Sequence, residues 1–234
     1  MKLGIIIATY KRDDNRTPFY LERCLKSIKN QTYQDYLVIL IGDKYEDNEE
    51  FENLSKIIDK DKIIIKNLER AVERERYYND RTALWCYGGV NAMNNGITLG
   101  LENNIEYFCH LDHDDYWENE HLETISQCLL KTNSYMVYTS SNFLNGSILP
   151  PIRQINHYTP IKPSSGLLIH SSTCVNFKKI PLRYRNADDG NLHSADSDLW
   201  ERIKTYLNEK NLESYFIEKI TCNHIEEGYE RYKK

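Results

Sequence analysis

The stretch that decides the fold is YFCHLDHDDYW, residues 107–117. An apolar run that is typical of a buried strand leads directly into Asp112, His113, Asp114 and Asp115, and two aromatic residues follow. Carboxylates this close together repel one another, and removing them from water is costly without a counter-charge. Two explanations are open: the acidic residues lie in water on a turn, or a cation binds among them.

Elsewhere the chain alternates apolar runs with segments of helical periodicity. Continuous β-branched runs at 3–10, 36–43 and 62–67 predict buried strands, separated by helices that begin at Thr17 and near Phe51. This alternation is the signature of a layered α/β domain with a largely parallel sheet. The later patterns predict helices over 90–101, 118–131 and 194–207, strands at 107–111, 135–139, 167–170, 173–177 and 215–219, and a long loop or change of subdomain over 142–165.

The bulk composition is that of one globular domain. The chain has 234 residues, of which 40% are hydrophobic and 28% charged, and this length allows a substantial core. A net charge of −5 predicts no general attraction to nucleic acid or to an anionic membrane. No C-x-x-C pair occurs, so reduced core thiols are favoured over disulfides or a zinc site. The cysteines are Cys24, Cys86, Cys109, Cys128, Cys174 and Cys222.

The apolar runs are all short. The run near the N-terminus has only a few residues, too few for the apolar region of a signal peptide, and no later run approaches the length of a membrane span. We therefore expect a soluble, cytoplasmic protein without a transmembrane segment. A peripheral position at a membrane stays open.

Polar residues follow three of the predicted strands, at 9–12, at Asp43 and at 112–115. Parallel sheets bind ligands beyond the carboxyl ends of their strands. One such end would be an ordinary loop, whereas three indicate a shared cleft. The segment 66–81 mixes basic and acidic side chains, which favours a solvated helix or loop over the alternative of a mobile flap.

Asp112 and Asp114 are separated by one residue at a predicted strand end. Alternate side chains of an extended segment point the same way, so both carboxylates can face one ligand while His113 faces away. Oxygen ligands suit Mg²⁺ or Mn²⁺ rather than zinc. The alternative is a solvated acidic turn that caps helix 118–131.

Five motifs follow one another along the chain. A strand ends in Thr-Tyr-Lys-Arg at 9–12, a second ends at Asp43, a glycine-rich helix start spans 88–96, L-D-x-D-D-x-W is present in full at 111–117, and 195–202 is similar to E-D-x-D-L-x-x-R. In this order the motifs resemble the family 2 glycosyltransferases, which have the GT-A fold.

The resemblance runs from residue 3 to about residue 205, with two departures. Met93 stands where the family often has arginine, which puts one phosphate or ribose contact in doubt. Ala195 replaces the first acid of the E-D pair, while the second acid, Asp196, is retained.

The resemblance implies a GT-A (Rossmann-like) α/β fold: a three-layer α/β/α domain around a central mixed, mostly parallel sheet. It also implies that residues 1–234 form one domain. Its nucleotide-sugar-binding half would be 1–117 and its acceptor-side half 118–234.

Site roles follow from the same resemblance. Asp43 would accept a hydrogen bond from an N–H of the nucleobase. Uracil fits this contact, thymine has the same N–H, and guanine also offers donors. The alternative for Asp43 is a plain turn residue after a strand. Asp112 and Asp114 would hold Mn²⁺ or Mg²⁺, with His224 as a further ligand or else a histidine that is satisfied by protein partners or solvated. The donor-nucleotide residues would be Thr9, Tyr10, Arg12, Asp43, Gly88, Gly89, Asn94 and Asp112.

Asp196 would be the general base that takes the proton of the acceptor hydroxyl. Its alternative role is to cap a helix over 197–207, and one residue at the mouth of a cleft can do both. Asp198 and Arg202 lie four apart and can pair on one helix face. Trp200 would either stack on an acceptor sugar or pack in the core.

The resemblance implies a metal-dependent glycosyltransferase of the hexosyltransferase class that uses a nucleotide-sugar donor, a UDP-sugar by preference, and acts with inversion. The acceptor hydroxyl would belong to a glycan, a lipid-linked molecule or a protein. A non-catalytic nucleotide-sugar-binding module on the same fold is the first alternative. A sugar nucleotidyltransferase is a weaker one, because the glycine-rich basic loop of such enzymes is absent after the first strand.

Overall fold

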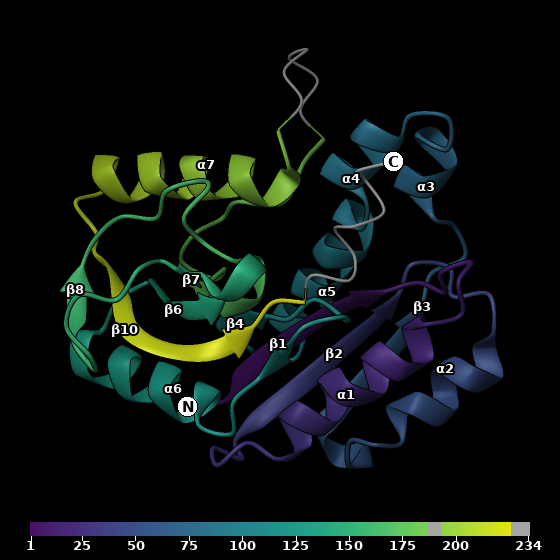
Figure 1. Cartoon of the computed structure of the whole chain (residues 1–234), viewed down its shortest axis with the longest axis horizontal. Coiled ribbons are helices and arrows are strands. Elements are labelled where there is room, and N and C mark those ends of the chain that lie inside the picture. The colour runs from purple at the N-terminus through teal and green to yellow at the C-terminus, as the bar shows by residue number, and fades with distance from the viewer. Residues whose placement is uncertain (187–192, 226–234) are drawn as a thin grey trace.

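The computed structural model describes residues 1–186 and 193–225, and Figure 1 shows how the elements are arranged. Within these residues ten strands form one sheet, whose main path runs β3-β2-β1-β4-β9-β6-β10-β5, with β7 beside β6 and β8 beside β10. The strands are β1 (Leu3–Thr9), β2 (Tyr36–Gly42), β3 (Ile63–Asn67), β4 (Tyr107–His110), β5 (Tyr116–Trp117), β6 (Met136–Asn142), β7 (Ile148–Leu149), β8 (Tyr158–Pro160), β9 (Thr173–Asn176) and β10 (Ser214–Asn223).

The first four strands of the path are parallel, and the sheet becomes mixed beyond them. β1 pairs in parallel with both β2 and β4, and β2 with β3. β9 then lies antiparallel between β4 and β6, while β6 and β10 are again parallel. The predicted mixed, mostly parallel sheet is confirmed. Because β9 follows β4 by more than sixty positions in sequence, this pairing joins the early and late parts of the chain in one sheet.

Helices cover both faces of the sheet and bury one apolar cluster on each. Seven α-helices occur among the described residues: α1 (Thr17–Lys29), α2 (Asn48–Ser55), α3 (Val72–Arg76), α4 (Arg81–Tyr87), α5 (Val90–Glu102), α6 (His121–Thr132) and α7 (Ala195–Glu209). α1, α2 and α6 pack on one face, and α4, α5 and α7 on the other (Figure 1). The predicted three-layer α/β/α arrangement is therefore confirmed.

Small residues let α5 lie close to the sheet. A Cβ atom at Gly100 would be 2.2 Å from a ring carbon of Phe108 in β4, and one at Gly96 would be 2.6 Å from Ile6 in β1. This close packing fixes the height of α5 above the strands whose carboxyl ends carry the candidate site.

The sequence predictions differ from the structure in a few segments. The run 167–170 is not a strand. Leu168 and Ile169 are buried, but a 3₁₀ turn spans His170–Ser172, and Ser172 closes it by donating both its amide and its hydroxyl to the carbonyl oxygen of Ile169. The helix expected from residue 118 begins at His121, after the short strand β5. The charged segment 66–81 holds α3 and the start of α4 rather than one solvated helix.

All six cysteines are buried and free, as predicted. Among residues 1–186 and 193–225, no helix combines the length and the apolar character that crossing a bilayer requires.

Candidate active site

The carboxyl ends of β1, β2 and β4 meet at one edge of the sheet. Thr9 at the end of β1 is in register with Gly42 at the end of β2, and Ile6 with His110 at the end of β4. The polar residues after all three strands are therefore brought together, as the sequence predicts. A hollow of about 510 Å³ opens beside this edge, lined by Tyr10, Lys11, Arg12, Asp13, Asn15, Glu46, Arg74, Tyr78 and Leu84.

Thr9 and Asp43 are buried side by side at the bottom of this edge. The Asp43 amide donates to the Thr9 carbonyl oxygen over 2.7 Å, and the two side chains are 1% and 2% exposed. Oγ1 of Thr9 and Oδ1 of Asp43 have no hydrogen-bond partner within the described part of the chain. Buried polar atoms of this kind are rare unless a ligand or water completes them, so this pair offers a vacant acceptor to a ligand.

Arg74 covers Asp43, and the sequence analysis did not single it out. Its Nε donates to Oδ2 of Asp43 over 3.1 Å, and its guanidinium carbon lies 4.7 Å from the centre of the Tyr10 ring. Burial raises the pKa of Asp43 above its ordinary value, and the arginine opposes this. Arg74 lies in the mixed-charge segment that we interpreted as solvent-exposed, and only the folded structure supplies its acidic partner.

Asp114 pairs with Arg12. Nη2 of Arg12 lies 2.6 Å from Oδ2 of Asp114, and Arg23 on α1 donates to the Asp114 carbonyl oxygen over 2.7 Å. The structure thus joins two predicted site residues from the ends of β1 and β4. The sequence analysis assigned no role to Arg23.

Asp112 is held by groups that precede β9. Its amide donates to Oγ of Ser171 over 3.0 Å, and its Oδ1 accepts from Nδ1 of His170 over 2.8 Å. Burial favours the neutral carboxyl, but the charge and hydrogen bond of His170 outweigh it and hold the pKa of Asp112 well below its usual range. The carboxylate is therefore ionised at neutral pH, and its side chain is 42% exposed.

Asp115 points into the protein rather than into the cleft. It is fully buried, and it accepts hydrogen bonds from Ser171 Oγ over 2.5 Å and from the amide of Ile225 over 3.1 Å. Nδ1 of His224 lies 3.1 Å from its Oδ1. Asp115 therefore orients the turn, and it does not cap α6, which begins six residues later.

His224 is engaged by Asp115 in this structure. Burial lowers the pKa of the ring, but the charges of Asp115, Asp112 and Asp114 raise it to about 9. A protonated ring has no free lone pair, so a metal bond at His224 would require the ring to lose its proton and leave Asp115.

His113 and the two glycines lie around the end of β1. Nδ1 of His113 faces the carbonyl oxygen of Ala8 at 3.4 Å, and burial lowers the pKa of the ring. Gly89 precedes α5 with φ +85°. Among the described residues outside its chain neighbours, a Cβ atom placed on Gly89 would have the Cβ atom of Ala8 within 4 Å and no other heavy atom. Gly88 ends α4, where a Cβ would lie 2.7 Å from the Leu84 oxygen.

The side chain of Asn94 on α5 forms hydrogen bonds with the protein backbone. Its Oδ1 accepts from the amide of Tyr184 over 3.0 Å, and its Nδ2 donates to the Tyr184 carbonyl oxygen over 2.9 Å. Both ends of the side-chain amide are thus used to hold Tyr184. Direct contact of this amide with a nucleotide stays a prediction.

Asp196 lies in the first turn of α7. The helix begins at Ala195 with Ser194 at the N-cap position, two residues earlier than a helix over 197–207 capped by Asp196, so the alternative capping role of Asp196 was wrong. Its charge contributes to a raised pKa of Tyr184, after the larger effect of burial. The carboxylate, half-buried and accepting from the Ser197 amide over 2.8 Å, therefore faces the same region as Tyr184.

The other residues of this helix are structural. Asp198 pairs with Arg202 over 2.7 Å, as predicted, and also with Arg185 over 2.8 Å. Trp200 is 1% exposed and belongs to the apolar core, so of its two predicted roles it packs.

The acidic turn suits a hard divalent cation. Among the described residues no group of three or more His, Cys, Asp and Glu side chains converges on one point. Mg²⁺ and its relatives usually take only one or two carboxylates and complete their coordination with water and substrate phosphates. Asp112 and Asp114 each keep one carboxylate oxygen without a partner in the described part of the chain, so the donor set fits such an ion.

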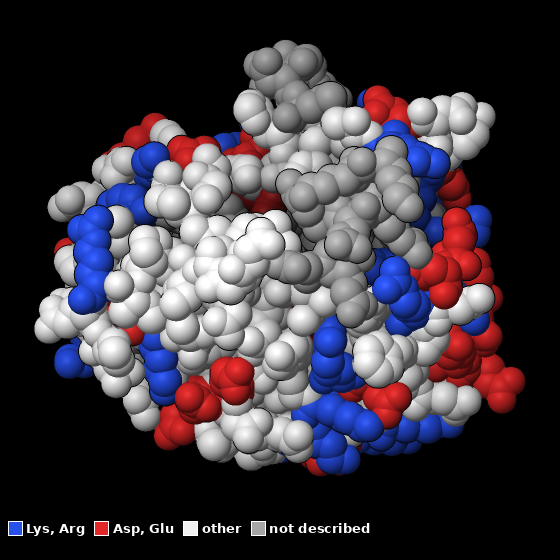
Figure 2. Space-filling view, in the orientation of Figure 1, with Lys and Arg blue, Asp and Glu red and all other residues white. Residues whose placement is uncertain are grey.

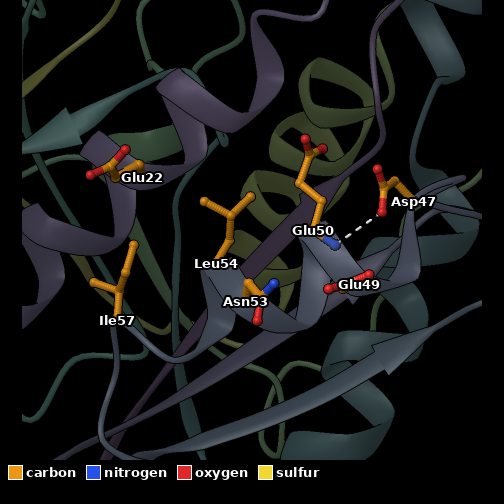
Figure 3. A pocket seen from close by; sticks show the side chains of 7 residues that line it. All are labelled: Glu22, Asp47, Glu49, Glu50, Asn53, Leu54 and Ile57. Carbon is orange, nitrogen blue, oxygen red and sulfur yellow. Dashed lines mark hydrogen bonds between the residues drawn. The ribbon is translucent and has the colours of Figure 1, made fainter.

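A second hollow, of about 520 Å³, lies between α1 and α2 and is mostly acidic (Figure 3). Structural contacts account for three of its four carboxylates, those of Asp47, Glu50 and Glu22. Asp47 caps α2 by accepting from the Glu50 amide over 3.0 Å, and Lys11 lies 3.2 Å from both of these side chains. Glu22 pairs with Lys26 one turn along α1.

Charges of both signs are interspersed on the face that Figure 2 shows. Lysine and arginine side chains gather at the lower centre of this view, near acidic ones, and the described residues of this face form no continuous basic surface.

The chain is similar in sequence to a viral protein. It is 37% identical over 238 residues to a protein of Acanthamoeba polyphaga mimivirus named uncharacterized glycosyltransferase R139, across 97% of this chain and 95% of that protein. No protein-family model matches the chain. The chain belongs to the glycosyltransferases, and its predicted GT-A fold is confirmed.

Solved structures share the fold at low sequence identity. S. aureus TarS 1–349 superposes with a TM-score of 0.65 at 16% identity, over 98% of this chain and 63% of that chain. The mannosyltransferase PcManGT from Pyrobaculum calidifontis superposes with a TM-score of 0.59 at 11% identity, over 99% of this chain and 59% of that chain. This chain thus spans less than two thirds of each of these proteins.

The His224–Asp115 pair predicts a specific pH dependence of stability. Folding raises the pKa of His224 from about 6.5 to about 9, so the pair stabilises fully below pH 6.5 and its effect disappears as the pH rises through 9. One pKa unit corresponds to about 1.4 kcal/mol, and partial solvent exposure weakens the pair. We expect His224→Gln to lower the free energy of unfolding by about 1–3 kcal/mol at pH 6 and by much less at pH 9.5.

Urea unfolding of both proteins at these two pH values measures this difference. His157→Gln, at an exposed histidine, is the matched control and should change little at either pH. A loss for His224→Gln that is the same at pH 6 and pH 9.5 would show that the ring stabilises by packing alone.

Proposed function

We propose that this chain is a metal-dependent glycosyltransferase that moves a sugar from a UDP-sugar to an acceptor hydroxyl with inversion, and that Asp196 is its general base. The observation that carries this proposal is the meeting of Asp43, Asp112 and Asp114 at one edge of the sheet. TarS has been solved with UDP and with UDP-GlcNAc, and PcManGT with GDP-Man and Mn²⁺. These complexes support a nucleotide-sugar donor and a divalent cation for this chain as well.

The nucleobase would bind between Tyr10 and Asp43. The vacant Oδ1 of Asp43 can accept one N–H, and the Tyr10 ring offers a surface for stacking. Arg74 makes both kinds of contact in this structure, because it lies over the ring and donates to the carboxylate. The base would therefore displace the guanidinium or share Asp43 with it. Uracil, with one N–H flanked by carbonyl groups, fits one vacant acceptor beside a guanidinium donor.

The diphosphate would lie beside Asp112 and Asp114, which would hold Mn²⁺ or Mg²⁺. When bound, the ion neutralises negative charge on the departing nucleoside diphosphate. Arg12 would release Asp114 and turn to the phosphate oxygens, since a guanidinium pairs equally well with phosphate. Gly89 leaves open space at the end of β1 in which the donor can approach the backbone.

The acceptor would enter on the side of α7. Asp196 would take the proton of its hydroxyl as the oxygen attacks the anomeric carbon, and the bond from that carbon to the diphosphate would break in the same displacement. One carboxylate base suffices for this direct reaction, which inverts the anomeric configuration. The half-buried position of Asp196 in the first turn of α7 supports this role, because an acceptor can reach a carboxylate that is partly in solvent.

Asp43→Ala tests the base pocket. Loss of a charge-assisted hydrogen bond at a buried site should weaken UDP binding by about 1–3 kcal/mol, measured by calorimetry with Mn²⁺ present. Asp47→Ala is the matched control. It removes an acid that caps α2, so it should lower stability without weakening the binding of UDP. Unchanged UDP affinity in Asp43→Ala, or tighter binding of GDP than of UDP by the wild type, would contradict this assignment.

Asp196→Asn tests the chemistry. The amide keeps the size of the side chain but cannot take the proton, so turnover should fall by about 10²–10⁴-fold while UDP affinity stays nearly constant. Asp198→Asn is the matched control on the same helix, because it breaks ion pairs with Arg202 and Arg185 and should affect stability rather than chemistry.

Two results would overturn the role of Asp196: near-normal turnover of Asp196→Asn, or a product that keeps the anomeric configuration of the donor. A wild-type protein that binds UDP-sugars tightly but releases no UDP with any acceptor would instead favour the non-catalytic binding module.

A further inference from the structure

His170 is clamped between an active-site carboxylate and a buried phenol. Its Nδ1 lies 2.8 Å from Oδ1 of Asp112, and its Nε2 lies 2.8 Å from the hydroxyl oxygen of Tyr184. Both ring nitrogens are therefore used, and the imidazole cannot turn without losing one of the bonds. The side chain is 12% exposed.

The strand register brings the ring to this place. β9 pairs with β4 so that Cys174 lies opposite Cys109, and the residues just before β9 therefore face those just after β4. The Ser171 hydroxyl completes the alignment by accepting from the Asp112 amide. The imidazole also packs on the ring of His110, with 4.8 Å between the ring centres, which limits its movement further.

Tyr184 is fixed in turn by the helix on the donor side. It is 5% exposed, and its backbone amide and carbonyl are both bonded to Asn94 on α5. A continuous series of hydrogen bonds therefore runs from α5 through Tyr184 and His170 to Asp112. Each member of the series is held on two sides.

We propose that His170, held by Tyr184, is a positioning residue that orients the Asp112 carboxylate for a divalent cation and a nucleoside diphosphate. This inference rests on the proposed function and assigns a role to two residues outside the sequence-predicted site. By occupying Oδ1, His170 directs the free Oδ2 to the cleft.

The arrangement works in either protonation state of the ring. The neutral ring with its proton on Nδ1 donates to Asp112 and accepts from the Tyr184 hydroxyl, and the protonated ring donates from both nitrogens. In both states the carboxylate meets an N–H donor. An exposed carboxylate on a turn would otherwise lose rotational freedom when the ligand binds, and prior orientation removes that cost. Groups that orient a metal ligand in this way typically contribute 10- to 100-fold to metal affinity.

Two amide substitutions at His170 remove its two hydrogen bonds one at a time. Asn places its NH₂ group where Nδ1 lies, so His170→Asn keeps a donor for Asp112 and loses the bond to Tyr184. Gln reaches instead to the place of Nε2, so His170→Gln keeps the contact with Tyr184 and loses the donor to Asp112. The affinity for UDP in the presence of Mn²⁺, measured by calorimetry, and the apo unfolding temperature are compared for both variants.

We expect His170→Gln to bind UDP with Mn²⁺ about 10- to 100-fold more weakly than the wild type, and His170→Asn to stay within about threefold. Tyr184→Phe, which removes only the hydroxyl, should lie between them. Both His170 variants lose one buried hydrogen bond, so their unfolding temperatures should fall by similar amounts. His121→Gln, at a buried histidine on α6 that bonds Thr221, is the matched control and should lower stability without lowering affinity.

Equal affinities of His170→Asn and His170→Gln would overturn the inference, as would losses of affinity that only follow the losses of unfolding temperature. Either result leaves the proposed function standing, provided that the wild type binds UDP with Mn²⁺. A wild type that binds no nucleotide would overturn the proposed function together with the inference.

Discussion

Three carboxylates follow one another within four residues at the end of β4, and the structure depends on how their charge is balanced. Each meets a different basic group: Asp112 meets His170, Asp114 meets Arg12, and the buried Asp115 meets His224. Since a carboxylate without a counter-charge is costly to remove from water, each of the three partners stabilises the turn, and the buried Asp115 needs its partner most.

The partners come from distant parts of the chain. Arg12 follows β1, His170 precedes β9, and His224 follows β10. Balancing the charge of one turn therefore ties together the two halves of the sheet, and the pairing of β9 with β4 is the backbone counterpart of the same constraint. The acidic turn thus serves the fold and, in the proposed function, the ligand.

The three pairs differ in how easily they can open. The Asp115 pair is buried and also bonded to Ser171 and to backbone, which suits a permanent structural contact. The Arg12–Asp114 pair lies at the cleft with side chains about one fifth exposed, so an incoming cation can replace the guanidinium there. Likewise Arg74 on Asp43 occupies the place proposed for the base. Arginines thus lie at the places proposed for the cation and the nucleotide.

Local sequence pattern was sufficient to predict most of the sheet, both faces of helices, and the meeting of Asp43 with Asp112 and Asp114. Those predictions rest on apolar periodicity and on the rule that parallel strands end at one edge. The role of Arg74 was not predicted, because the sequence of a mixed-charge segment does not indicate which arginine will pair with a buried acid. The roles of His170 and Tyr184 were not predicted either, because their partners are set by the β4–β9 register, which periodicity does not reveal. The run that contains His170 was itself predicted as a strand, since its buried leucine and isoleucine outweighed the serine-stabilised turn that follows.

The most direct test of the account is a crystal structure with Mn²⁺ and UDP, with the ion located by its anomalous scattering. The account predicts one manganese peak in contact with the carboxylates of Asp114 and Asp112, the uracil against Tyr10 with its N–H on Asp43, and Arg12 released from Asp114. A manganese ion bound elsewhere, or a uracil outside the Tyr10–Asp43 pocket while Arg12 stays on Asp114, would contradict it.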